Sequence, residues 1–357
     1  GVVTTYGSPL YRDHVPTKDE LLVAKLRRAG GILLGKTATP EFGAGGNTTV
    51  NEVHGYTRNA FDPDRACGGS SGGSGVALAC GMMPLCTGSD SGGSLRKPAT
   101  FSGVSAIRPT TGLVPSDKRG VGFTNFSVQG PMARTADDCA LMLSVMAGDD
   151  VEDPLSFNVR REDYRQLPEV DLSTLRVAIS VDFGWAPVEH GIRDTFEARL
   201  KRFQSVFKSC ERFDPSLDTA LDVFWILRGV QFLASHLERY RNHRDQVGQN
   251  IVANVEAGLE MKPEDIGWAN AEHTRLYRQF QQMFNDYDVL ITPGQPITPT
   301  AVEQRNVTEV NGVPMKNYMN ASALTSSLTL MGNPCVSTPC GVDHTGMHQG
   351  GDRCWCF

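Results

Sequence analysis

The sequence lacks three features that would place its 357 residues in a membrane, nucleic-acid-binding or disulfide-stabilised class. No apolar run is long enough to cross a bilayer, and no signal segment stands at the start. Acidic residues outnumber basic ones, 40 to 34, and this net charge of −6 argues against nucleic acid or anionic lipid as a partner. The nine cysteines contain no C-x-x-C pair, which favours free thiols over disulfides or a zinc site. We therefore expect a cytoplasmic protein.

The order of the periodic segments predicts an α/β fold. Hydrophobic residues make up 40% of the chain, enough for a sizeable core. The patterns predict helices over 21–29, 75–80, 136–147, 192–207 and 276–287, and strands over 32–34, 85–88, 175–181 and 289–292. Strands interleaved with helices favour a sheet covered by helices on both faces.

Residues 30–37 read GGILLGKT and match the phosphate-binding P-loop consensus. A P-loop needs a strand before the glycines and a helix opening at the lysine. Here a helix comes first, started by a predicted Thr17–Glu20 capping box and stopped at Gly30. Pro40 disfavours a helix after Lys36, so we reject the phosphate-binding interpretation.

Two serine–glycine clusters, 68–75 and 91–94, flank a predicted helix and strand. Glycines at this density let backbone amides approach a ligand. Consecutive amides before a serine can stabilise a developing oxyanion. The second cluster therefore predicts Ser94 as a nucleophile, with an oxyanion hole formed by the amides of Ser91, Gly92, Gly93 and Ser94 itself.

The first cluster offers a rival site. Gly69 to Gly73 also fit G-x-S-x-G, the nucleophile elbow of α/β-hydrolases, with Ser71 at its centre. That mechanism needs a later acid and histidine, for which Asp343 and His344 are candidates. No strand clearly leads into the elbow, so this alternative ranks second.

Five segments, in this order and spacing, are highly specific, and through them the chain resembles the amidase signature family over residues 1 to about 345. They are LLGKTATPEFG (33–43), GYTRNAFDPDRACGGSSGG (55–73), TGSDSGGSLRKPATFSGVSAIRPTTG (87–112), QGPMARTADDCALML (129–143) and LMGNPCVSTPCG (330–341). The resemblance implies a mixed β-sheet core covered by helices on both faces. It also implies hydrolysis of carboxamides through an acyl-enzyme, without a metal or cofactor.

The family uses a Ser–cis-Ser–Lys triad. Carried over, Ser94 is the nucleophile and Ser70, in a cis peptide, is the bridging serine 24 positions earlier. Ser71, Asp90 and Arg96 are expected to support the site, the last two by bracing the loop. The bridging hydroxyl would accept the nucleophile's proton and pass its own to a neutral lysine.

The resemblance places that lysine upstream of Gly1, outside this chain. We assign no proton transfer to Lys36 or Lys97 and expect both to be structural or solvent-facing, with a minor alternative that keeps Lys97 near the pocket rim. We expect residues 1–357 alone to have negligible activity. The tail departs as well: residues 346–357 do not follow the family, and the Cys354–Cys356 pair is a weak metal motif. We expect a single incomplete domain over 1–345, truncated at both ends, with an unpaired sheet edge where a strand is lost.

The expected function is hydrolysis of a small-molecule amide to an acid plus ammonia or an amine. Alternatives are an amidotransferase subunit that supplies ammonia to a partner, and a catalytically inactive homologue. A homodimer is left open. Residues 216–268 depart from the family segments, and their apolar side chains either shape a pocket for a hydrophobic or aryl acyl group or simply pack the core.

Overall fold

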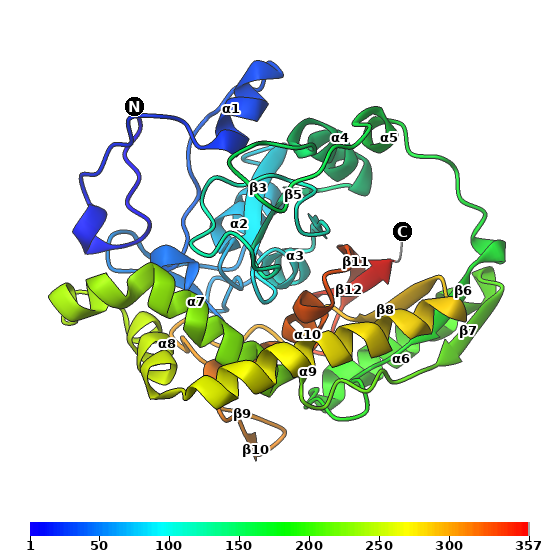
Figure 1. The fold of residues 1–357 in the computed structure, drawn as a ribbon. Helices are drawn as coiled ribbons and strands as arrows, with labels where there is room; N and C mark the ends of the chain where they lie inside the picture. The colour runs from blue at the N-terminus through cyan, green and yellow to red at the C-terminus, as the bar shows by residue number, and fades with distance from the viewer. Residues whose placement is uncertain (356–357) are drawn as a thin grey trace.

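A mixed eight-stranded sheet runs through the centre of the molecule (Figure 1). The computed structural model describes the backbone of residues 1–355 and the side chains of residues 1–351. The strand order is β3-β5-β4-β11-β12-β8-β6-β7. These strands are β3 (Leu85–Asp90), β4 (Ser105–Arg108), β5 (Val128–Ala133), β6 (Arg176–Ile179), β7 (Ser209–Arg212), β8 (Val289–Pro293), β11 (Cys335–Val342) and β12 (His348–Trp355). All neighbours in the sheet are antiparallel except β6, which runs parallel to β7 and β8.

Two small hairpins lie outside this sheet, β1 (Thr49–Asn51) with β2 (Gly55–Thr57) and β9 (Glu309–Val310) with β10 (Val313–Pro314). The α-helices are α1 (Leu21–Arg28), α2 (Gly72–Ala79), α3 (Arg96–Ser102), α4 (Ala136–Met146), α5 (Glu162–Arg165), α6 (His190–Phe203), α7 (Ala220–His243), α8 (Gln249–Glu260), α9 (Pro263–Gln282) and α10 (Ala323–Met331). Short 3-10 turns are η1 (Pro9–Tyr11), η2 (Glu41–Gly43), η3 (Leu172–Thr174), η4 (Gln204–Val206), η5 (Met283–Asn285) and η6 (Tyr318–Ser322).

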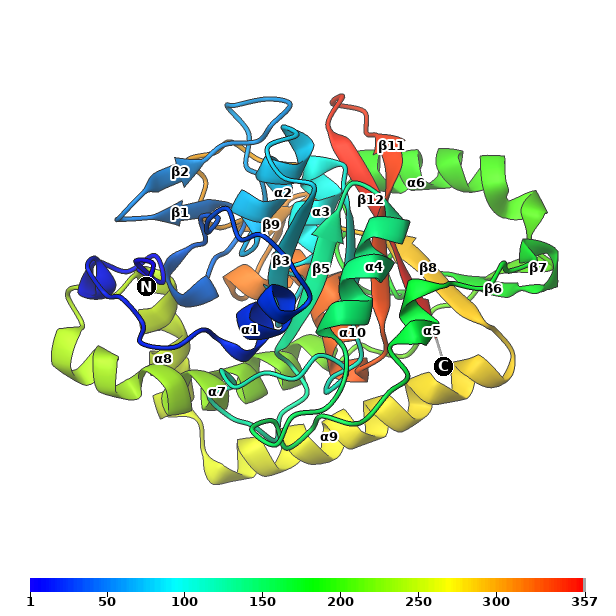
Figure 2. The same ribbon diagram turned by 90° about the horizontal axis from the view of Figure 1, so that it is seen from above.

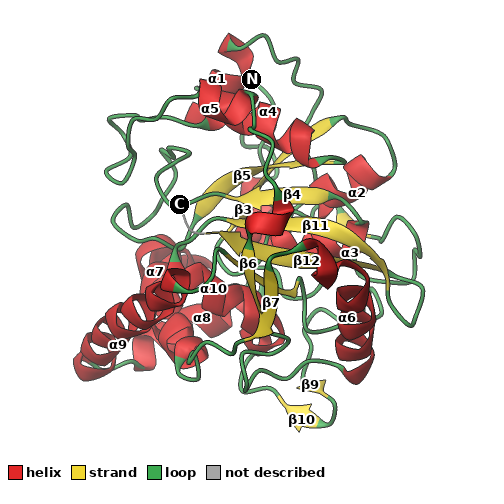
Figure 3. Ribbon diagram, turned by 90° about the vertical axis from the view of Figure 1, so that its right-hand side faces the viewer, coloured by secondary structure: helices red, strands yellow, loops and turns green. Residues whose placement is uncertain are grey.

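Helices cover both faces of the sheet, because side chains alternate along each strand. In β4, Ala106 packs toward α2 and α3, whereas its neighbour Ile107 packs toward α4. In β8, Leu290 joins the core formed with α7, α9 and α10, while Ile291 packs against α6. The strand register places Leu290 on the same face as Ala106, and Ile291 on the same face as Ile107. Helices α2, α3, α7, α9 and α10 therefore cover one face of the sheet, and α4 and α6 cover the other (Figure 2). Figure 3 shows α7, α8, α9 and α10 gathered together.

This architecture confirms the predicted fold class, a mixed sheet between two helical layers. Most predicted elements are present with shifted ends. The helix after the first serine–glycine cluster starts earlier than expected, at Gly72, and the helix predicted from 276 begins at Pro263. The Thr135 cap is confirmed, since its side chain accepts a hydrogen bond from the Asp138 amide at the start of α4.

The strand predicted over 32–34 is wrong. Residues 31–39 have no regular structure, and Ile32 and Leu34 are 86% and 69% exposed. A short apolar run becomes a strand only when a neighbouring strand pairs with it. In the described part of the chain no strand does so. The capping box is also wrong, because Glu20 is the N-cap of α1 and caps no amide with its side chain.

The tail does not leave a gap in the sheet, which corrects the expectation of an unpaired edge. Residues 348–355 form β12, which pairs with β11 on one side and β8 on the other. The strand is therefore central. The side chains of Cys354 and Cys356, named as a weak metal pair, lie outside the described residues. Among the helices of residues 1–355, none has both the length and the apolar character of a membrane span.

Candidate active site

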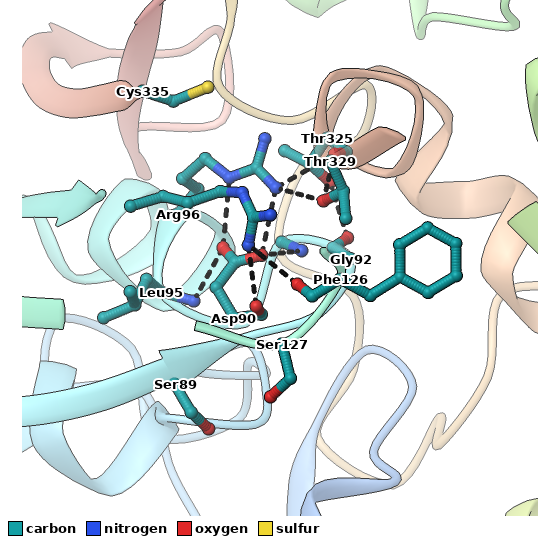
Figure 4. Close-up of polar contacts among 12 residues, drawn as sticks. Ser89, Asp90, Gly92, Leu95, Arg96, Phe126, Ser127, Thr325, Thr329 and Cys335 are labelled. Atoms are coloured by element: carbon teal, nitrogen blue, oxygen red, sulfur yellow. Dashed lines mark hydrogen bonds and ion pairs between the residues drawn. The ribbon is translucent and has the colours of Figure 1, made fainter. Parts of the chain in front are cut away.

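β3 ends at Asp90 and α3 begins at Arg96, so residues 91–95 form a tight connection between them. The Asp90 carboxylate holds this loop: it accepts the Gly93 amide at 2.8 Å and the Leu95 amide at 3.1 Å (Figure 4). Arg96 closes the loop from the helix side, with Nε and Nη2 each 3.0 Å from a carboxylate oxygen. Both side chains are fully buried, so they brace the loop and do not face solvent.

A second guanidinium, from Arg108, shares the Asp90 carboxylate at 3.4 Å and donates to the Asp90 carbonyl at 2.7 Å. Arg96 extends the network to α10, where it donates to the Thr325 carbonyl and the Thr329 hydroxyl, each at 2.9 Å. Burial alone would raise the pKa of Asp90, but the two guanidinium charges outweigh it and hold the pKa well below its ordinary value. The carboxylate is therefore ionised at neutral pH.

The loop glycines are needed because other segments approach them closely. A Cβ added at Gly93, where φ is +122°, would lie 2.4 Å from the Thr325 hydroxyl oxygen. A Cβ added at Gly92 would lie 2.9 Å from both Phe224 and Met319. The Gly92 carbonyl accepts the Thr325 hydroxyl at 2.9 Å. The loop is thus packed between α7, η6 and α10 and is held in one conformation.

This geometry narrows the set of oxyanion donors. The Gly93 amide already donates to Asp90, so that N–H is not free to bind an oxyanion. No hydrogen bond joins the amides of Ser91, Gly92 or Ser94 to another of the described residues. The predicted donors Ser91 and Gly92 therefore remain candidates, together with the amide of Ser94 itself, and Gly93 does not.

The two serine–glycine clusters meet. The Ser71 amide donates to the Ser94 carbonyl at 3.1 Å, which places Ser70 beside the loop that carries Ser94. The peptide bond between Gly69 and Ser70 is cis, as the resemblance implies. Ser70 is 4% exposed, and a Cβ added at Gly43 would lie 3.5 Å from its hydroxyl oxygen. Ser71 is fixed separately, because the Ser89 amide donates to its hydroxyl at 3.2 Å.

Lys97 is not solvent-facing. It lies in the first turn of α3, three residues after Ser94, and is only 3% exposed. Its Nζ donates to the Ser322 hydroxyl at 2.7 Å, and its stem packs against Gly68. Burial lowers the pKa of Lys97 to about 8. None of the described carboxylates lies within ion-pair distance of this ammonium.

Replacing Lys97 with methionine is expected to raise the free energy of unfolding at pH 7 by about 1–3 kcal/mol, because a buried charge is removed. The size of this stability difference depends on pH. The folded-state pKa lies below the unfolded value, so the unfolded chain binds more protons between pH 8 and 10.5, and wild-type stability rises with pH across that window. The variant should lack this rise in urea titrations. Lys201→Met, on the exposed side of α6, is the control; identical slopes in wild type and Lys97→Met would contradict the prediction.

Neither the P-loop match at residues 30–37 nor the nucleophile-elbow match at residues 69–73 forms a site in the structure. Lys36 is exposed and donates to the Thr4 hydroxyl, in a segment with no following helix, as expected once the P-loop was rejected. No strand in the described chain leads directly into residues 69–73 as an elbow requires. Asp343 accepts from Thr345 and Gln349 within the turn between β11 and β12, so it is committed there.

Sequence reasoning placed Phe224 in the 216–268 region, expected either to shape a pocket or to pack the core, but it did not identify Met319 or Thr325, which also wall the loop. Phe224 and Met319 press on Gly92, and Thr325 presses on Gly93. They come from positions 130 or more residues later in the chain, and no local motif links them to the serines. The polar run at the start of α10 was the only available signal, because hydroxyls in an otherwise apolar helix need buried partners.

Comparison with known proteins identifies relatives of this chain. A family model described as Amidase matches residues 1–350. An acylamidase of Rhodococcus erythropolis is 31% identical over 352 residues, covering 98% of this chain and 74% of the relative. A glutamyl-tRNA(Gln) amidotransferase subunit of Alkaliphilus metalliredigens is 32% identical over 368 residues, covering 96% of this chain and 73% of the relative.

Solved structures share the fold. A bacterial aryl acylamidase of the amidase signature family superposes with a TM-score of 0.87 at 24% identity, covering 96% of this chain and 72% of that one. A protein from a vestigial complex linked to the origins of an s-triazine catabolic enzyme also gives 0.87, at 27% identity, covering 100% and 77%. By its sequence match and its fold, the chain belongs to the amidase signature family.

Proposed function

We propose that the chain hydrolyses a carboxylic acid amide through an acyl-enzyme on Ser94. The observation that carries this proposal is the contact between the two serine–glycine clusters, in which the Ser71 amide donates to the Ser94 carbonyl at 3.1 Å. The relatives named as acylamidase and aryl acylamidase support an amide as the substrate class.

In the proposed reaction, the Ser94 hydroxyl attacks the amide carbonyl carbon as its proton passes to Ser70. Ser70 passes its own proton to a neutral lysine. The tetrahedral oxyanion takes hydrogen bonds from the free amides of the 91–94 loop, and each such donor contributes about 10²–10³ in rate. The intermediate collapses, the C–N bond breaks, and the amine or ammonia leaves with the proton that the lysine returns. Water then attacks the acyl-enzyme, and the acid is released.

Among the described lysines, Lys36 donates to Thr4 and Lys97 to Ser322, and none donates to Ser70 or Ser94. For this reason we expect residues 1–357 alone to have negligible activity. If the complete gene product also lacks a lysine about seven residues before Gly1, the inactive homologue becomes the better hypothesis.

An amidotransferase component is the second candidate function, because a relative of that name is 32% identical to this chain. In that role the same acyl-enzyme would form, and the ammonia would pass to a partner. Co-purification of the chain with charged tRNA and a kinase-like partner protein would favour it.

The test is a screen of simple, aryl and dicarboxylic amides, run in parallel on residues 1–357 and on the complete gene product. Ammonia or amine release is measured. We expect release from at least one amide with the complete product and almost none with residues 1–357. Robust release by residues 1–357 alone would show that the proton acceptor is assigned wrongly. Lys97 would then be the lysine to test as the acceptor.

A further inference from the structure

Arg228, in the middle of α7, is a buried cation without a counter-ion among the described residues. It is 8% exposed, and none of the described carboxylates lies within ion-pair distance of it. Its flat faces rest on aromatic rings, with the guanidinium carbon 4.5 Å from the Phe232 centroid and 5.9 Å from that of Tyr318. Buried charges are normally paired, because desolvation of an unpaired charge is costly.

The guanidinium is fixed on one side and open on the other. Nε donates to Asn254 Oδ1 at 2.9 Å, and Nη2 donates to the Tyr318 hydroxyl at 2.9 Å. Asn254 is held in turn by its own bond to the Tyr318 hydroxyl at 2.8 Å. Nη1 has no hydrogen bond among the described residues. It is also not one of the fully buried polar atoms that lack a partner, so it keeps contact with solvent.

Arg228 lies in the wall of the candidate site. Phe224, one helical turn before it, is the ring that approaches Gly92, and Met319, next to Tyr318, approaches Gly92 as well. Phe224, Arg228 and Phe232 are spaced four residues apart and form one stripe along α7. The Phe232 end of this stripe also connects to the site. Phe232 stacks with His236, and His236 stacks with Phe42, whose neighbour Gly43 faces the Ser70 hydroxyl.

The groups nearest Arg228 on this stripe supply no negative charge. Burial lowers the pKa of His236 to about 4, so this ring is neutral at pH 7. Lys97, also buried at the site, has no carboxylate partner among the described residues either, unlike Arg96 and Arg108, which share Asp90. Arg228 and Lys97 thus bring positive charge that no described carboxylate pairs with, which favours a ligand that carries an anion.

We propose that Arg228 binds a carboxylate on the acyl part of the substrate, so that the preferred substrates are monoamides of dicarboxylic acids. The inference rests on the proposed function, whose amide site supplies the reacting end of the ligand. A guanidinium held by Asn254 and Tyr318 presents its remaining N–H groups in a fixed orientation, which suits the planar carboxylate.

The experiment measures binding, so that it does not depend on turnover. Succinamate and glutaramate are titrated into residues 1–357 by ligand-detected NMR, with butanamide and pentanamide as their neutral counterparts. We expect the carboxylate ligands to bind about 10- to 100-fold more tightly than the neutral ones. Arg228→Met should remove that preference and leave the affinity for the neutral amides within about threefold.

Control variants separate recognition from folding. Arg241→Met removes an exposed arginine from the same helix and should keep the preference. Arg228→Lys keeps the charge but loses the fork geometry, and should reduce the preference about tenfold; it serves as the test if Arg228→Met does not fold. Tyr318→Phe, which frees one side of the guanidinium, should weaken the carboxylate ligands only.

Three results would overturn the proposal. The first is equal affinity of wild type for charged and neutral amides. The second is a preference that survives in Arg228→Met, or one that is as large in Arg228→Lys as in the wild type. The third is a preference lost in Lys97→Met while Arg228→Met retains it. Hydrolysis of the same amides by the complete gene product is assayed separately. A binding preference without hydrolysis would refute the proposed function and keep the anion site. Hydrolysis without a binding preference would support the proposed function and refute the anion site.

Discussion

Replacing Ser94 with alanine is expected to lower kcat/KM of the complete gene product at least about 10⁴-fold, on whichever amide the screen identifies. The nucleophile acts as a unit with its proton acceptors, so its loss removes the covalent route. Only the rate enhancement from substrate binding and from the oxyanion hole then remains. The measurement is ammonia or amine release under single-substrate conditions. Loss of the covalent acyl adduct on the peptide containing Ser94, detected by mass spectrometry, should accompany it.

Ser89→Ala is the matched control for this variant. Ser89 belongs to the same strand-and-loop segment, its side chain is exposed, and only its backbone contacts Ser71. It should keep activity within about twofold. Should Ser94→Ala retain more than a tenth of the wild-type rate while its circular dichroism is unchanged, the assignment of the nucleophile would be wrong.

Replacing Asp90 with asparagine is expected to lower the free energy of unfolding by about 3–5 kcal/mol, because two buried guanidiniums lose their shared carboxylate. The loop amides of Gly93 and Leu95 also lose a charged acceptor. Urea unfolding followed by circular dichroism measures the change. Activity should fall with stability, since the same carboxylate shapes the loop that presents Ser94.

The pH dependence of this contribution has a defined sign. The pKa of Asp90 is lower in the folded than in the unfolded chain. Its contribution is therefore fully present above the ordinary pKa near 4 and is lost as pH falls below it. Asp64→Asn, which removes an exposed partner of Arg58, is the control and should change stability by less than about 1 kcal/mol. An Asp90→Asn protein within 1 kcal/mol of wild type would show that Arg96 and Arg108 do not depend on this carboxylate.

The sequence was sufficient to predict the parts of this protein that depend on local chemistry. The serine–glycine clusters predicted a glycine-rich site because close backbone approach restricts the residue type at each position, and Gly93 shows that restriction directly. The Thr135 cap and the interleaved helices and strands followed from short-range patterns in the same way. The five family segments added the order in which these parts occur along the chain.

Tertiary structure decided what depends on partners far away in the chain. Residues 32–34 read as a strand but stay exposed, and residues 348–355 read as an atypical tail but form a central strand, because strand formation depends on backbone partners more than on side-chain type. Lys97, expected to be structural or solvent-facing, is buried, and this burial lowers its pKa. Arg228 entered the site wall only through packing of α7 against η6, a contact across 90 residues that no sequence spacing predicts.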